Sequence, residues 1–247
     1  MDAPGRMVRP PSERDRGAPD PLQSPTQPSG AVLGPAEAWL PWSGLTLVLF
    51  LVVHLAAVSL ALLDPARFER LAAGLHRQFW LPGAELLLAA ALLLHPALAL
   101  VRTLRNRRAR GPASGPLRSR RAGGSEAVVA LAGRWAPWSG GVLLVFLVMH
   151  LLQLRLHRPA PGDELSALLG ALASPIALAL YGLAGLAVAL HLLHGYESAH
   201  RSLGWLDPTN RDRIRRLGRG LALLLGAGFS LLPFALVLRA CQPAIAP

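Results

Sequence analysis

The sequence contains no lysine, a single cysteine and few charged residues. Its 25 basic residues are therefore all arginines, and only 14 residues are acidic. The single thiol, Cys241, excludes an intramolecular disulfide and any iron–sulfur cluster held by several cysteines of this chain. Charged residues make up 16% of the chain, whereas a soluble domain has about 25%. The shortage of charge argues against a soluble domain.

Apolar residues are abundant and are gathered into long runs. They make up 52% of the chain, and the mean hydropathy is +0.39. A helix needs about 20 apolar residues to cross a bilayer core of about 30 Å. Five runs approach or exceed this length, and none has a basic residue in its central part: 41–63, 82–101, 138–156, 172–194 and 218–238. The sequence predicts an all-α membrane protein with five transmembrane helices.

The arginines are concentrated in alternate connections between these runs. The connections 102–134 and 199–216 are strongly basic, whereas the first and third also contain acidic residues. Positive charge on alternate loops is typical of the cytoplasmic side. We therefore expect a multi-pass protein of the inner (cytoplasmic) membrane with its N-terminus in the cytoplasm and its C-terminus outside. The net charge of +11 is explained by this topology and by contact with membrane lipid, and no nucleic-acid partner is expected.

Composition also divides the chain into three parts. Residues 1–37 are rich in Pro, Gly, Ser and Arg and have no apolar run, which predicts a disordered cytoplasmic tail. Residues 38–240 form the predicted membrane domain, in which the first four helices make a bundle. Residues 241–247 are a short outer tail.

The membrane domain contains an internal repeat. Residues 41–55 read PWSGLTLVLFLVVHL, and residues 137–151 read PWSGGVLLVFLVMHL, 96 positions later. The same offset relates His95 in the second run to His191 in the fourth. The first two spans therefore correspond to the third and fourth, with both copies crossing the membrane in the same direction. The fifth span lies outside the repeat and is expected to pack against it, with Pro233 as a possible kink.

Four histidines lie inside the predicted spans at two depths. His54 and His150 each follow the proline at the cytoplasmic start of their run by 13 residues, or about 20 Å of helix, which places both in the outer half. His95 and His191 fall in the inner half. Ionisable residues inside a membrane are costly and usually functional. Two pairs of histidines on different helices are typical of a bundle that binds two haems, each through two imidazoles.

These histidines could also have other roles, as structural residues or as a proton relay. A zinc or copper transporter would usually add carboxylates or thiols, but Glu85 is the only carboxylate in the predicted spans. His194, three residues after His191, competes with it as the inner ligand or could contact a haem edge or propionate. The 96-residue offset favours His191.

The order of these histidines resembles a known family. One histidine in each of the first four of five spans is similar to the two-haem cytochrome b subunit of succinate:quinone oxidoreductases (succinate dehydrogenases and fumarate reductases). The motif His191-Leu-Leu-His-Gly195-Tyr-Glu-Ser198, followed by Ser202-Leu-Gly204-Trp205, and the Trp138-Ser139-Gly140 segment resemble that family locally. The resemblance covers residues 38–240.

The resemblance implies a role in the respiratory chain and the tricarboxylic acid cycle. It assigns His95 and His191 to a proximal haem b near the cytoplasm and His54 and His150 to a distal haem b. It implies a flavoprotein partner with FAD and an iron–sulfur partner at the cytoplasmic face, and a membrane quinone, usually menaquinone, as the substrate. This chain has neither a dinucleotide fingerprint nor cysteine ligands for those partners' cofactors. It therefore has no dicarboxylate active site of its own.

The quinone site is less well marked. Glu85, level with the distal pair, is the candidate for proton handling, or an ordinary polar residue at a helix start. The family's carboxylate two positions before the fourth-helix ligand is absent, because Ala189 occupies that position, which leaves open any coupling to proton translocation. Ser43 and Ser139 could bond haem propionates or cap helices. The alternatives are a cytochrome b of the hydrogenase or formate dehydrogenase type and a haem-free transporter or scaffold.

Overall fold

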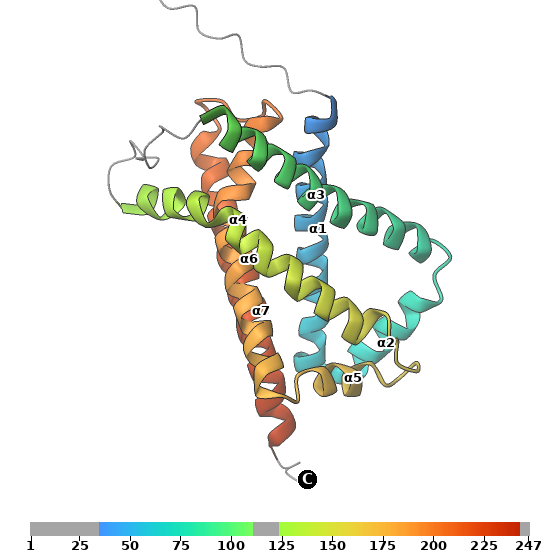
Figure 1. Ribbon diagram of the computed structural model, residues 1–247. Helices are drawn as coiled ribbons and strands as arrows, with labels where there is room; N and C mark the ends of the chain where they lie inside the picture. Colours follow the sequence, from blue (N-terminus) through green and yellow to red (C-terminus); the bar gives the residue numbers. More distant parts are fainter. Residues whose placement is uncertain (1–34, 111–123, 243–247) are drawn as a thin grey trace, which may run out of the picture. The chain divides into compact units, whose positions relative to one another are not determined.

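The computed structural model describes residues 35–110 and 124–242, and this part of the chain is helical, without strands (Figure 1). Most of the predicted N-terminal tail lies outside the described residues, and its last three residues begin the first helix. In chain order the helices are α1 (Pro35–Leu63), α2 (Pro65–His76), α3 (Leu81–Arg110), α4 (Gly124–His150), a π-helical turn (Leu151–Arg155), α5 (Glu164–Ala171), α6 (Pro175–Ser202) and α7 (Arg211–Cys241).

Five helices are long and apolar enough to cross a membrane, which confirms the predicted number and order of spans. The segments with this character are Ala38–Leu63, Leu81–Ala109, Leu131–Arg155, Pro175–Ser202 and Arg211–Cys241. The two short helices, α2 and α5, lie in the first and third connections. Glu69 of α2 accepts hydrogen bonds from the backbone N–H groups of Glu164 and Leu165, so its carboxylate holds the start of α5 against α2.

Several helices continue beyond the predicted spans. α3 runs on to Arg110, and α7 already begins at Arg211. The predicted connection 199–216 is therefore wrong in length, because only 203–210 separates α6 from α7. Apolarity marks where a helix leaves the hydrocarbon, but arginine is a good helix former and allows the helix to continue into water. Gly204, with φ 73°, allows the sharp turn after α6.

The two prolines that were expected to open spans lie inside helices instead. Pro41 is within α1, and Pro137 is within α4. The helices begin one or more turns earlier, so the expectation that these prolines start them is wrong. The equal spacing from each proline to its histidine is unaffected, because it runs along continuous helix in both copies.

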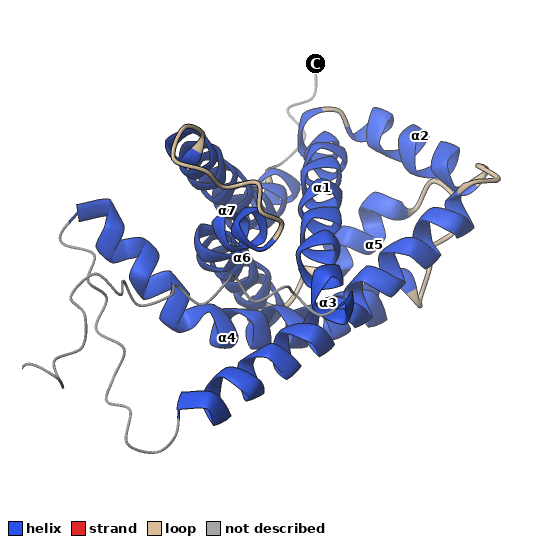
Figure 2. Ribbon diagram, turned by 90° about the horizontal axis from the view of Figure 1, so that it is seen from above, coloured by secondary structure: helices blue, strands red, loops and turns tan. Residues whose placement is uncertain are grey.

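Four of the five long helices pack as two pairs, and α7 packs on the second pair. α1 packs mainly against α3, while α6 packs against α4 and most extensively against α7 (Figure 2). Glycines allow the close approach of α6 and α7: a Cβ on Gly185 would lie 2.4 Å from the Ser230 backbone nitrogen, and one on Gly226 would lie 2.5 Å from the Ala189 Cβ. Small residues are the usual means by which membrane helices approach closely.

Candidate functional site

His54, His95, His150 and His191 meet in the two pairs that the sequence predicts. The ring centroids of His54 on α1 and His150 on α4 are 6.0 Å apart, with an interplanar angle of 79°. Those of His95 on α3 and His191 on α6 are 6.1 Å apart, with an angle of 74°. One pair joins α1 to α4, and the other joins α3 to α6.

A serine hydroxyl contacts each histidine of the inner pair in the same way. Ser43 Oγ lies 3.3 Å from His95 Nδ1, and Ser139 Oγ lies 3.3 Å from His191 Nδ1. The Ser43 hydroxyl donates its hydrogen to the backbone carbonyl of Leu40, and the Ser139 hydroxyl donates to that of Ala136. The two serines lie inside α1 and α4, so the expectation that they could cap those helices is wrong.

These contacts favour one tautomer of the ring. A hydroxyl has one hydrogen, and when the carbonyl accepts it the Ser43 oxygen faces His95 as an acceptor. This arrangement assigns the ring proton of His95 to Nδ1. The same reasoning applies to Ser139 and His191. Nε2 of both imidazoles is left with a free lone pair, which is the form that binds a metal ion.

The inner rings also fit closely against glycines. A Cβ added to Gly44 would lie 3.0 Å from the His95 Cε1 atom, and one added to Gly140 would lie 3.4 Å from that of His191. A larger residue at Gly44 would displace the ring. Gly44 therefore makes room for the His95 imidazole, whereas a Cβ at Gly140 would meet the His191 ring at an ordinary contact distance.

In the outer pair, His150 has a hydrogen-bond partner that sequence reasoning did not identify. The Tyr181 hydroxyl, on α6, lies 3.2 Å from His150 Nδ1 and donates to Gln153 Oε1 at 3.1 Å. With its hydrogen directed to Gln153, the phenol oxygen accepts from His150 Nδ1, and this arrangement assigns the free lone pair to Nε2.

Aromatic rings cover the outer histidines in both repeat copies. Phe50 stacks on His54 with centroids 5.2 Å apart, and Phe146 stacks on His150 at 5.5 Å. Each phenylalanine precedes its histidine by four residues, one helical turn. Phe229 of α7 also stacks on His54, at 5.9 Å. The outer pair therefore lies among apolar side chains.

The structure separates the two candidates for the inner ligand on α6. His191 faces His95, as described above. The His194 ring lies against α4, where a Cβ on Gly133 would be 2.9 Å from its Nδ1 atom. His191 is thus the residue of this helix turn that pairs with α3.

Glu85 lies near the start of α3 in an ion-pair cluster. Its carboxylate is 2.5 Å from Arg155 and 3.4 Å from Arg158, and its side chain is 35% exposed. The arginines neutralise the carboxylate and hold it close to the π-helical turn that follows His150. Its role in proton handling stays a prediction.

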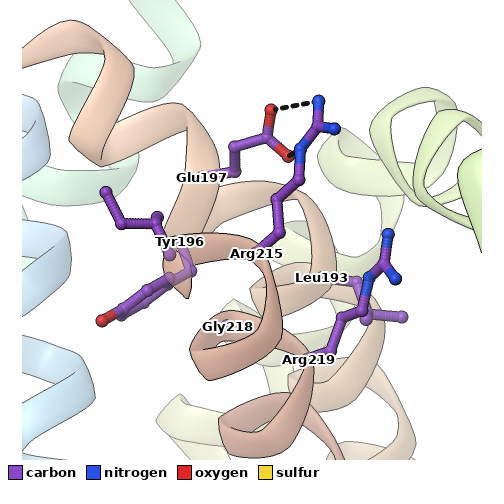
Figure 3. A pocket seen from close by; sticks show the side chains of 7 residues that line it. Leu193, Tyr196, Glu197, Arg215, Gly218 and Arg219 are labelled. Carbon is purple, nitrogen blue, oxygen red and sulfur yellow. Dashed lines mark hydrogen bonds and ion pairs between the residues drawn. The ribbon is translucent and has the colours of Figure 1, made fainter. Parts of the chain in front are cut away.

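A second carboxylate within the spans, Glu197, was missed because α6 was expected to end before it. Its side chain is buried, and it lies 3.1 Å from Arg215 Nε of α7 (Figure 3). It is also 2.5 Å from Arg201. The spacing of four residues between Glu197 and Arg201 is the usual signal for a helical ion pair. Arg102 of α3 donates to Ser202 in the same region. These contacts join the ends of α3, α6 and α7.

The histidine pairs stand without further protein ligands. Among the residues that the structure describes, no group of three or more His, Cys, Asp or Glu side chains is placed to hold a metal ion. Comparison with protein-family models, curated proteins and solved structures found no match to this chain. The geometry of the histidine pairs and their sequence context are therefore the features that bear on function.

Proposed function

We propose that this chain is a two-haem b-type cytochrome, with His95 and His191 holding one haem and His54 and His150 the other. The proposal rests on one observation. Two histidine pairs at different depths have nearly equal ring separations, 6.0 and 6.1 Å. Three of the four imidazoles, moreover, have a hydrogen-bond partner that leaves Nε2 free for a metal ion.

The ring separation fits two imidazoles on opposite sides of one metal ion. A bond from a metal to an imidazole nitrogen is about 2 Å, and the ring centre lies about 1 Å beyond the nitrogen. Two such ligands on one axis have ring centres roughly 6 Å apart. The large interplanar angles are compatible with this, because each ring is free to rotate about the axis. Both pairs therefore match the spacing of a six-coordinate haem.

The alternatives explain less of the geometry. Edge-to-face aromatic rings also have centroids about 4.5–7 Å apart, but a plain aromatic contact does not require the matched Ser43 and Ser139 bonds. A bare zinc site needs about four ligands, and each pair supplies two. A metal ion whose remaining four ligands come from a macrocycle fits a two-histidine site.

A haem held in this way supplies reversible transfer of one electron between ferric and ferrous iron. The protein side chains prepare the sites for it. Ser43, Ser139 and Tyr181 hold the ring orientation and tautomer of their histidines. Phe50 and Phe146 keep the outer pair in apolar surroundings. The equal contacts in both copies also support a structural repeat, with α1 and α3 equivalent to α4 and α6.

The resemblance described above extends the proposal to a biological role. The chain is proposed to anchor a succinate:quinone oxidoreductase and to pass electrons between an iron–sulfur partner and a membrane quinone, with menaquinone as the expected quinone. FAD and the iron–sulfur clusters belong to the partner subunits. Glu85 is predicted from the sequence to lie at the same membrane depth as His54 and His150. It remains the candidate for proton handling at the quinone site.

The role in succinate oxidation is tested in membranes that contain the complete complex. Succinate is expected to reduce both haems, and the chain is expected to co-purify with a flavoprotein and an iron–sulfur protein. A variant lacking the inner ligand His95 is the control, because it should break the path from the cytoplasmic partner. Reduction by hydrogen or formate, but not by succinate, would instead assign the chain to the hydrogenase or formate dehydrogenase type.

The arginine distribution predicts the orientation of the chain in the membrane. A reporter or protease site at 105–121 should be reached only from the cytoplasm, and one at 159–164 only from outside. Cys241, the only thiol of the chain, is exposed at the end of α7, which is expected to lie outside, so a membrane-impermeant thiol reagent should label it from outside without any mutation. Labelling only from the cytoplasmic side would invert the proposed electron path.

A further inference from the structure

The outer pair differs from the inner pair in how its two histidines are supported. His150 Nδ1 meets the Tyr181 hydroxyl, which in turn donates to Gln153. Tyr181 is 8% exposed. The neighbours of the His54 ring are other rings, those of His150, Phe50 and Phe229, and the described residues supply no hydrogen bond to it.

The asymmetry arises at equivalent positions of the repeat. Subtracting the 96-residue offset from Tyr181 gives Glu85, so α3 has a carboxylate where α6 has a phenol. The Glu85 carboxylate is bound by Arg155 and Arg158. Arg155 belongs to the π-helical turn that directly follows His150 and also contains Gln153. A π-helical turn within a helix is uncommon and frequently marks a functional site.

We infer that Tyr181 positions His150 as a ligand of the outer haem and lowers the reduction potential of that haem. Gln153 strengthens this effect of Tyr181. This inference rests on the proposed haem function. The Gln153 carbonyl accepts the phenolic hydrogen, which polarises the phenol oxygen and makes it a better acceptor for His150 Nδ1–H. A hydrogen bond accepted from Nδ1–H raises the basicity of Nε2 and fixes the ring orientation. A more basic axial ligand favours ferric over ferrous iron and so lowers the reduction potential of the outer haem.

The test is a redox titration of both haems in Tyr181→Phe, which removes the hydroxyl and keeps the ring. The outer haem should become easier to reduce, with its ratio of ferrous to ferric iron at a fixed potential rising about threefold, or roughly 30 mV for a one-electron couple. The ferric electron paramagnetic resonance signal of the same haem should move, and that of the inner haem should not. Gln153→Leu should give a smaller shift in the same direction.

The chain offers a matched control, because it has only two tyrosines. Tyr196 packs on His200 near the other end of α6, so Tyr196→Phe makes the same chemical change away from the outer pair and should leave both potentials unchanged. If Tyr181→Phe fails to assemble, Gln153→Leu measures the same network. Two haems with unchanged potentials in Tyr181→Phe, or an equal shift in Tyr196→Phe, would overturn this inference alone. A wild-type chain without haem would overturn the proposed function and the inference with it.

Discussion

His191→Ala is expected to reduce the haem content from two per chain to one, with loss of the inner haem, whereas His194→Ala should keep both. Residues three apart on a helix point about 60° away from each other around the axis, so only one of these histidines is able to face His95. His191 does so, at a ring separation of 6.1 Å. Its loss removes half of the axial ligation, while loss of His194 removes at most a contact at the edge of the site.

Haem quantitation and redox titration of the purified variants measure this difference. His194→Ala is the matched control, because it is the same substitution one turn further along α6. A shift in the potential of the inner haem in His194→Ala is compatible with the account. Retention of both haems in His191→Ala, with loss of one in His194→Ala, would mean that the ligand assignment on α6 is wrong by nearly one turn.

The pairing of histidines could be predicted because it depends on regular geometry. A transmembrane helix has a fixed rise per residue, so the distance from a shared PWSG segment to a histidine becomes a depth. The 96-residue offset then relates His54 to His150 and His95 to His191 without any knowledge of packing. The same offset relates Ser43 to Ser139, but their contact with the partner histidines depends on the rotation of α3 and α6, which a depth argument does not include.

The supporting residues of the outer pair depend on irregular geometry and were not predicted. Gln153 approaches Tyr181 from the π-helical turn after His150, and a pattern of apolar residues gives no sign of such a turn. The ion pair of Glu85 with Arg155 joins residues 70 positions apart. From the sequence, Glu85 and Arg155 are two separate residues at span ends, because the partner of a charged side chain is not visible without the fold.

The packing of α7 also went beyond the sequence prediction. Gly218, Ala222 and Gly226 are spaced four residues apart, so they share one face of this helix, and all three are buried. A stripe of small residues is a known means of helix association in membranes. The sequence predicts that this helix packs against the repeat, but it does not indicate which helix it contacts. In the structure α7 packs on α6, and this is the most extensive contact between any two helices of the described residues.

The central claim, that the chain holds two b haems, is tested most directly by the reduced-minus-oxidised optical spectrum of the purified protein with pyridine haemochrome quantitation. The account predicts two protohaems per chain, both six-coordinate and low-spin, because four imidazoles in two pairs supply two complete sets of axial ligands. A fully loaded preparation that contains no haem, or a single haem per chain, would contradict it.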